Sequence, residues 1–544
     1  MKHDLGRLLR TLRWLRARQI LHRALFRLPV VPPPAGLAPA RRPSTTKWVS
    51  PAGRPPTMTA QSRLRFLSEE HELDVVGWDS ARLPLLWRYN LHYFDDLNAF
   101  DAAARNAWHV DLVQRWIGDN PIGRGTAWAP YPTSLRIVNW IKWFLGGQEP
   151  RSSWLDSLAL QTRWLVKRLE RHLLGNHLFV NAKALVFAGC YFDGPEADKW
   201  RALGIRILRE EIAEQVLPDG GQFERSPMYH LLALEDVLDV VNMTHAVKLT
   251  DPACTELIVH LRSILPSMLD WAACMRHPDG SLVRFNDTAD GIAPPLGELQ
   301  RYARALGVVT PELPTAGVRT LQPSGYVRID WGAATGFIDV APIGPDYLPG
   351  HAHADTLCFE LSIDGRRIVV NRGTSVYGEG PRRQLERGTA AHNTVQIASA
   401  DSSEVWAGFR VGRRARPRSV TLTESNLSAS HDGYRSLSGR PVHHRSWHWR
   451  TGELQIEDRL MPGTALPAVA RFHLAPELSI AKCEGSVWAV SHEGREIAQV
   501  RVDQGEPYVE PWMHAVAFGE VAAASTLAVR LVAQRAHVTI SWND

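Results

Sequence analysis

Cysteine is scarce in this chain. Five of its 544 residues are cysteines, an odd number, and no two of them stand in a CxxC pair. The spacing therefore supports neither a disulfide framework nor a cysteine zinc site, and it favours buried free thiols. The five are Cys190, Cys254, Cys274, Cys358 and Cys483.

Long apolar runs are lacking as well. No apolar run in the sequence reaches the roughly 18 residues that a membrane-spanning helix needs. Near the N-terminus, seven arginines between Arg7 and Arg27 interrupt every apolar stretch, so the apolar segment of a signal peptide cannot form. We therefore expect the protein in the cytoplasm or on a membrane surface, with the periplasm as the alternative.

Leucines in the same segment recur at helical spacing, opposite most of the arginines. This pattern predicts a basic amphipathic helix within residues 1–29, followed by a Pro-rich linker over residues 30–60. Either the helix contacts a membrane surface or a protein partner, or it packs on the protein's own body with its basic face in solvent. The leucines are Leu5, Leu8, Leu9, Leu12 and Leu15.

The composition excludes a disordered or low-complexity chain, since 44% of the residues are hydrophobic and the 40 Gly and 36 Pro follow no fixed period. At roughly 100–200 residues per domain, the length corresponds to about three domains. The net charge of +5 is unevenly spread, because residues 1–60 carry twelve Lys or Arg and one acid, Asp4, which leaves −6 for residues 61–544. The overall basicity therefore belongs to the N-terminal segment and is no evidence for a polyanionic substrate.

The body of the chain divides into two regions with different spacings of apolar residues. Apolar residues at spacings of three and four from about Leu64 to Val309 predict a series of helical hairpins. Short alternating runs joined by DG-type turns after Pro323 predict antiparallel strands. We expect a helical domain over residues 61–320 and an antiparallel β-sandwich over residues 321–544.

Two polar clusters lie at the starts of predicted helices. Asn176 and His177 follow Gly175, and an amide beside an imidazole suits proton transfer next to a carboxylate; a helix cap is the alternative. Tyr229 lies in the second cluster, residues 221–230. Its phenol is either a catalytic group or part of a packed aromatic residue with a satisfied hydroxyl.

Two further clusters lie beside predicted strands. His351 and His353 come directly before a strand, and on extended backbone both imidazoles point to one side, toward one cavity or one metal ion. His392 stands at a second strand, and Asn371 lies in a segment before it. His353, Asn371 and His392 therefore form a candidate metal set, in which the asparagine supplies only a neutral amide oxygen.

In their order and spacing, these clusters resemble the heparinase II/III-like polysaccharide lyases, in which an incomplete (α/α) toroid precedes an antiparallel β-sandwich. The similarity covers most of residues 85–450 and leaves the N-terminal segment outside. The motifs that carry it are WRYNLHYFDDL, GRGTAWAPYPTSLRIVNW, GNHLFVNAKAL, GGQFERSPMYH, FNDTADG, PGHAHADTLCFEL, VVNRGTSVYG and TAAHNTVQI.

The resemblance implies β-elimination on a uronate-containing glycan, in which the C5 proton is removed, the C4–O bond breaks and an unsaturated uronate remains. By similarity, Asn176 and His351 hold the carboxylate. Tyr229 protonates the leaving oxygen and also serves as base when the C5 proton lies on its own face. His177 is the base on the opposite face or a further carboxylate contact. A phenolate at Tyr229 requires positive neighbours, for which Arg225 and the imidazoles are candidates.

The resemblance also implies a metal ion. His353 and His392 match the family's zinc ligands, and Asn371 stands where the family usually has an aspartate. The expected ion is therefore a structural zinc that braces the loop carrying His351, at a site that has lost one charge. Further candidates for substrate contact, with surface salt bridges and helix caps as the alternative for each, are Arg124, Tyr131, Arg136, Arg225, Asn286, Asp287, Arg382 and Arg383.

Two other functions remain open. A glycoside hydrolase would use two carboxylates, available among Asp219, Glu224 and Asp287, but it would leave the His, Tyr and Asn cluster idle. A non-catalytic glycan-binding protein would keep the fold, and Asn371 is the feature that points to it. No nucleic-acid-binding module is recognisable, so the expected partner is an acidic polysaccharide of sparse charge, by analogy a bacterial surface polysaccharide. The sequence indicates no oligomeric state.

Overall fold

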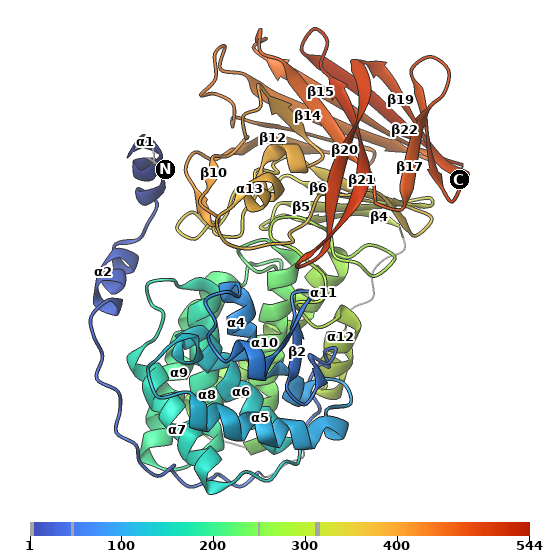
Figure 1. The fold of residues 1–544 in the computed structure, drawn as a ribbon. Coiled ribbons are helices and arrows are strands. Elements are labelled where there is room, and N and C mark those ends of the chain that lie inside the picture. Colours follow the sequence, from blue (N-terminus) through green and yellow to red (C-terminus); the bar gives the residue numbers. More distant parts are fainter. Residues whose placement is uncertain (1–4, 45–47, 248–250, 311–315, 544) are drawn as a thin grey trace.

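The computed structural model describes residues 5–44, 48–247, 251–310 and 316–543. A helical domain forms one half of the molecule and an antiparallel β domain forms the other (Figure 1). The predicted order of helices first and strands second is confirmed. Within the described residues, none of the helices combines the length and the apolar character needed to cross a membrane.

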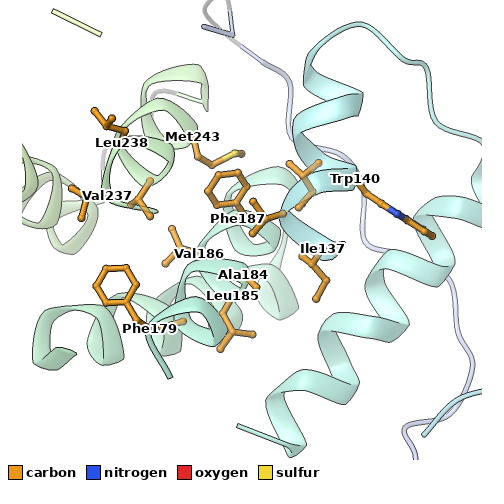
Figure 2. Packing of buried hydrophobic residues seen from close by; sticks show 14 of the residues in the cluster. Ile137, Trp140, Phe179, Ala184, Leu185, Val186, Phe187, Val237, Leu238 and Met243 are labelled. Carbon is orange, nitrogen blue, oxygen red and sulfur yellow. The ribbon is translucent and has the colours of Figure 1, made fainter. Parts of the chain in front are cut away.

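The helical domain is built around α8 (Gly175–Tyr191), which is buried on nearly every side. Glycines let α8 and α9 (Pro195–Gln215) approach closely, because a Cβ atom on Gly189 would lie 2.5 Å from the backbone nitrogen of Arg201. Figure 2 shows the apolar core that α8 forms with its neighbours, with Phe187 of α8 lying near Met243. The other helices are α4 (Leu85–Leu91), α5 (Asn106–Asp119), α6 (Pro130–Leu145), α7 (Ser152–Lys167), α10 (Pro227–Val247), α11 (Pro252–Cys274) and α12 (Leu296–Ala305).

A small three-stranded sheet precedes these helices and corrects the sequence analysis, which placed helical texture from about residue 64. Its strands are β1 (Met58–Ala60), β2 (Arg63–Phe66) and β3 (Glu69–Glu72), followed by the short helix α3 (Leu73–Val76). Leu64 and Phe66 of β2 are buried and alternate with exposed arginines, and the Phe66 ring meets Trp87 at 5.2 Å. The alternation of apolar and polar residues covers only four residues, which is too short to be distinguished from the helical pattern around it.

The β domain contains three larger antiparallel sheets. One has the order β4 (Gly317–Leu321), β5 (Tyr326–Trp331), β6 (Ala334–Asp339), β7 (Phe359–Ile363), β8 (Arg366–Val369). A second has the order β12 (Pro417–Leu422), β13 (Asn426–His431), β14 (Val442–Arg450), β15 (Glu453–Met461), β22 (Arg535–Ser541), β19 (Arg495–Gln504), β18 (Val487–His492), β17 (Leu478–Lys482). A third has the order β20 (Glu506–Ala517), β21 (Glu520–Arg530), β16 (Ala468–His473), β9 (Val395–Ile397), and β10 and β11 form a separate ribbon. The long strands alternate buried and exposed residues, as in β15, so that their inner faces share one apolar core. The strands that matter below are β6 (Ala334–Asp339), β7 (Phe359–Ile363), β10 (Val405–Trp406) and β11 (Arg410–Val411), with the helix α13 (Pro381–Arg387).

The N-terminal segment forms two short helices, α1 (Leu5–Leu12) and α2 (Ala17–Phe26), which lie along one edge of the molecule outside both domains (Figure 1). The side chain of Arg10 pairs with Glu404 beside β10 at 2.7 Å, while Arg18 pairs with Glu214 of α9 at 3.1 Å. The segment therefore contacts the β domain through α1 and the helical domain through α2. We call residues 5–28 the N-terminal strap.

The connection between β6 and β7 reaches from the β domain onto the helical domain. Leu348 in this connection lies against the first residue of α8, because a Cβ atom on Gly175 would be 2.3 Å from the Leu348 side chain. Tyr347 packs near Phe223, and the strap covers it from outside, with the Arg16 guanidinium 3.6 Å from the ring. This connection carries His351, so the contact between the two domains sets the position of that imidazole.

Candidate active site

The structure brings the four predicted catalytic residues to the boundary between the two domains. Asn176 and His177 begin α8, Tyr229 lies in the first turn of α10, and His351 comes from the β6–β7 connection. The rings of Tyr229 and His351 lie 3.9 Å apart. The buried carboxylate of Glu224 interacts electrostatically with both His177 and His351, and its Oε2 lies 3.7 Å from His351 Nε2.

The carboxylate of Asp287 is enclosed by donors from the β domain. His351 Nδ1 lies 2.9 Å from Oδ2, and His353 Nε2 lies 2.8 Å from Oδ1. Both guanidinium NH groups of Arg383 also donate to this carboxylate, as does the Thr374 hydroxyl at 3.1 Å. Burial alone would raise the pKa of Asp287, but Arg383 and the two histidines hold it well below its usual range. The sequence placed Asp287 at the substrate; in the structure its oxygens hold protein groups in place.

Tyr229 keeps its proton in this site. Its hydroxyl lies 3.1 Å from that of Tyr377, and the Tyr377 ring lies 5.9 Å from the His351 ring. Burial, reinforced by Tyr377, raises the pKa of Tyr229 well above its usual range. A protonated phenol is ready to donate, so this environment suits a general acid.

The surroundings of His177 favour its charged form, whereas those of Tyr229 favour the neutral form. Its Nδ1 lies 3.1 Å from Glu170 Oε1, and Asn181 in turn donates to the other oxygen of Glu170. Burial lowers the pKa of His177, but the Glu170 carboxylate more than reverses this effect, and the resulting pKa is raised above the ordinary value. The ring also lies 4.6 Å from that of Tyr131, which places this predicted substrate contact at the site. Asn176 is half-buried, and its side chain has no hydrogen-bond partner among the described residues.

The other predicted contacts lie in different surroundings. Arg136 is fully buried, donates to Gln161 and stacks on the Trp116 ring at 3.8 Å. Arg225 turns its guanidinium to the carbonyl of Ser324. The amide of Asn286 donates to backbone and to Tyr326, and its oxygen accepts from His353 N–H; Arg124 is exposed at the surface.

The predicted metal ligands are only partly assembled. Both ring nitrogens of His392 and the Nδ1 atom of His353 are buried without a hydrogen-bond partner, and the two rings lie 5.3 Å apart. Asn371 is directed elsewhere, because its amide donates to Glu360 at 3.1 Å and its oxygen accepts from Asn393 N–H. The sequence prediction for Asn371 as a ligand therefore finds no support in its orientation.

A different set of donors surrounds His392. One ligand atom each from Asp355, Cys358 and His392, all buried, lie within 4.8 Å of one another. Burial raises the pKa of Asp355 to about 6 and that of the Cys358 thiol well above its usual range. Carboxylate, thiolate and imidazole are all ligands that zinc accepts. Two of these ligands, Asp355 and Cys358, stand in the sequence HADTLC, where a single cysteine carries no spacing signal.

Glu170, Glu224 and Tyr377 are the site residues that the sequence analysis did not assign to this chemistry. Glu170 lies seven positions before His177, on the other side of a turn, and no local spacing joins them. Tyr377 follows the motif VVNRGTS and reaches Tyr229 across 148 residues of sequence. Only the packing of the two domains brings these groups together.

Two family models match the chain. The model described as Heparinase II/III N-terminus matches residues 98–303, and the one described as Heparinase II/III-like, C-terminal, matches residues 313–543. A heparin-sulfate lyase of Bacteroides stercoris is 30% identical over 274 residues, which are 46% of this chain and 40% of that protein. The chain thus aligns with less than half the length of the heparin-sulfate lyases it matches.

Two other similarities cover more of the chain. FtsZ-localized protein C of Caulobacter vibrioides is 24% identical over 490 residues, which are 82% of this chain and 79% of that protein. The crystal structure of the heparan sulfate lyase HepC from Pedobacter heparinus superposes with a TM-score of 0.59 at 17% identity, over 90% of this chain and 84% of that one. This structural similarity confirms the predicted fold of a helical toroid followed by a β-sandwich.

We predict that Asp287→Asn destabilises the protein by about 3–5 kcal/mol, because Arg383 is then left buried without its counter-charge. Thermal and urea unfolding, followed together, measure the change. Glu70→Gln is the matched control: it removes the surface partner of Arg65, whose side chain is 63% exposed, and should cost less than about 1 kcal/mol. Equal stability of the two variants would contradict the role given to Asp287.

We predict that Glu170→Gln lowers the pKa of His177 to below its ordinary value, because burial remains while the carboxylate that opposes it is removed. An NMR titration of the His177 imidazole, assigned by its absence in His177→Gln, measures this shift. Glu424→Gln, at an exposed position, should leave the titration unchanged. An unshifted His177 pKa in Glu170→Gln would show that Glu170 does not control it.

Proposed function

Because this chain belongs to the heparinase II/III-like family, we propose that it is a polysaccharide lyase that cleaves uronate-containing glycans by β-elimination. The observation that carries the proposal is the arrangement at the domain boundary, where the protonated phenol of Tyr229 lies against His351 and the imidazole of His177 is backed by a carboxylate. β-Elimination needs an acid, a base and a means to neutralise the uronate carboxylate, and the site offers all three.

The proton transfers follow from the two pKa directions. Neutral His177, oriented at Nδ1 by Glu170, takes the C5 proton, and Glu170 stabilises the imidazolium that forms. The electron pair from C5–H forms the C4=C5 bond as the C4–O bond breaks, and Tyr229 gives its proton to the leaving oxygen. This assignment favours uronates whose C5 proton and C4 oxygen lie on opposite faces of the ring. Since His177 must be neutral, activity should rise with pH through its raised pKa.

The carboxylate of the substrate is held by His351 and Asn176. Asp287 fixes His351 through Nδ1, which leaves Nε2 for the substrate, and the Asn176 amide has no competing partner among the described residues. Two of the arginines named as substrate contacts, Arg136 and Arg225, donate to protein groups. The site therefore offers few fixed cations, in keeping with an acidic polysaccharide of sparse charge, such as a bacterial surface polysaccharide.

A glycoside hydrolase is less well supported by the geometry. Asp219 accepts hydrogen bonds from the backbone of Gly221 and Ser324, and Asp287 is enclosed by its donors. A non-catalytic binding role is the second candidate, and one observation favours it: the similarity that covers 82% of the chain is to FtsZ-localized protein C, a protein named for its location rather than for a reaction.

For the metal site we propose a structural zinc ion held by Asp355, Cys358 and His392, with the free Nδ1 atom of His353 close by. Bound zinc would supply a rigid cross-link and no reactive group. Asp355 and Cys358 follow His351 and His353 on the β6–β7 connection, so a cross-link to His392 would brace the segment that presents His351. The N-terminal strap lies outside both domains (Figure 1), and we assign it to a contact of the enzyme with its surroundings rather than to catalysis.

We predict that Tyr229→Phe lowers the rate of elimination by about 10²–10⁴-fold while the glycan still binds, because only the transferable proton is removed. Ultraviolet absorbance of the C4=C5 bond, with a panel of polyuronates, measures elimination, and Tyr508→Phe serves as a tyrosine control away from the site. Reducing ends without the absorbance would establish a hydrolase, and binding without cleavage by the unmodified protein would establish the non-catalytic role. Full activity in Tyr229→Phe would overturn the assignment of the acid.

We predict that the purified protein contains about one zinc ion per chain and that Cys358→Ser loses it, because a hydroxyl does not replace a thiolate ligand. Elemental analysis and thermal unfolding with and without a chelator measure the content and its effect on stability. Cys274→Ser, at a buried cysteine outside the cluster, should keep the metal. A chain that stays metal-free and thermally unchanged after added zinc would refute the site.

A further inference from the structure

The N-terminal strap turns its apolar side to solvent. Leu5, Leu9 and Leu12 lie on one face of α1, at spacings of four and three residues, and are 43–68% exposed. In α2 and the residue after its C-cap, a similar face carries Ile20, Leu21, Leu25 and Leu28, each 47–58% exposed. No residue of α1 is buried. Each of the two consecutive helices thus presents an unpartnered apolar face at the edge of the molecule, and we call these residues together the leucine stripe.

The opposite, basic side of the strap is the side that faces the protein. Arg7 and Arg10 both pair with Glu404, Arg16 pairs with Glu214, and Gln19 donates to the carbonyl of Tyr347 at 3.3 Å. This orientation reverses the arrangement expected for a helix that packs on its own body with its basic face in solvent. Turning the leucines inward would break these bonds, so the described part of the chain leaves these leucines uncovered.

A pocket lined by six arginines adjoins the strap. It has a volume of about 360 Å³, and its charged lining residues are Arg13, Arg413, Arg414, Arg416, Arg418, Arg435 and a single acid, Asp432. Arg418 pairs with Asp432 at 2.8 Å, Arg413 with Glu404 at 3.5 Å, and Arg414 with Asp346, so the uncompensated charge of the pocket comes from the other three arginines. Arg13, Arg414 and Arg416 gather around the Trp14 ring, at 4.7, 4.5 and 5.7 Å.

The pocket and the stripe are continuous. Arg13 directly follows Leu12, so the apolar face of α1 ends at the rim of the pocket. Arg13, Arg416 and Arg435 form no ion pair within the described part of the chain, and neither do Arg23 and Arg27, which flank the stripe on α2. A group of like charges held together in this way attracts an anion with several oxygen atoms, and arginine forks match phosphate.

We infer that this surface docks on an anionic phospholipid bilayer, with a headgroup phosphate in the arginine pocket and the leucine stripe in the interfacial layer. An acidic polysaccharide would satisfy the arginines but would leave the stripe in water. A bilayer supplies both phosphate and apolar depth over the length of two helices, which is the combination that interfacial amphipathic helices use. The inference does not depend on the proposed lyase activity, since none of these residues lies in the cleft.

Co-sedimentation of the full chain with vesicles tests the inference. Binding is expected to vesicles of phosphatidylcholine with phosphatidylglycerol, and to fall with added salt. Leu9→Glu with Leu21→Glu should abolish binding, and Arg13→Glu with Arg435→Glu should weaken it at least about tenfold. Val259→Glu and Arg82→Glu are the matched controls, at exposed positions of the helical domain, and should bind normally.

The other outcomes overturn the inference. Equal binding to phosphatidylcholine alone would show that the arginines play no part. Absence of vesicle binding, together with a dimer that Leu9→Glu dissociates, would assign the stripe to a second copy of the chain. If the unmodified protein is retained on an acidic polysaccharide but does not bind vesicles, the pocket is a glycan site. Elimination activity, measured in parallel with the absorbance assay, stays unchanged in every variant if docking and catalysis are separate.

Discussion

The carboxylate of Asp287 is the buried charge on which the geometry of the site depends. It lies in the loop after α11 of the helical domain, whereas all of its side-chain donors, including Arg383, His351 and His353, belong to the β domain. In surroundings of low dielectric constant neither Arg383 nor Asp287 is stable without the other, so the ion pair fixes how the two domains meet. Asp287 thereby sets the position of His351 opposite Tyr229, two residues from different domains.

The sequence was informative wherever a signal was local. Periodicity separated the helical half from the β half, and the motifs around Asn176, Tyr229 and His351 marked segments that the fold brings to one place. What it could not show is which atoms of a motif face the cleft. Arg136, Asp287 and Tyr131 all stand in polar motifs that look alike in the sequence. In the structure Arg136 and Asp287 are enclosed by protein donors and acceptors, whereas the Tyr131 ring contacts that of His177. That difference depends on partners up to 96 residues away.

The metal site and the N-terminal segment illustrate two other limits. At the metal site, an imidazole from a distant segment joins two ligands from one stretch of four residues, and a single cysteine among them carries no spacing signal. In the N-terminal segment, helical spacing correctly separated leucines from arginines, but the direction of the two faces depended on Glu404 and Glu214, which lie almost 400 and 200 residues away. Amphipathic pattern alone determines the faces of a helix and leaves open which one the protein covers.

The way the strap lies over Tyr347 bears on how the chain can be shortened. Arg16 and Gln19 hold Tyr347 from one side while Phe223 of the helical domain holds it from the other, four residues before His351. The two regions matched by the family models begin at residue 98 and therefore exclude Arg16 and Gln19. A fragment trimmed to those regions would keep every residue of the cleft and lose the outer wall of the segment that presents His351.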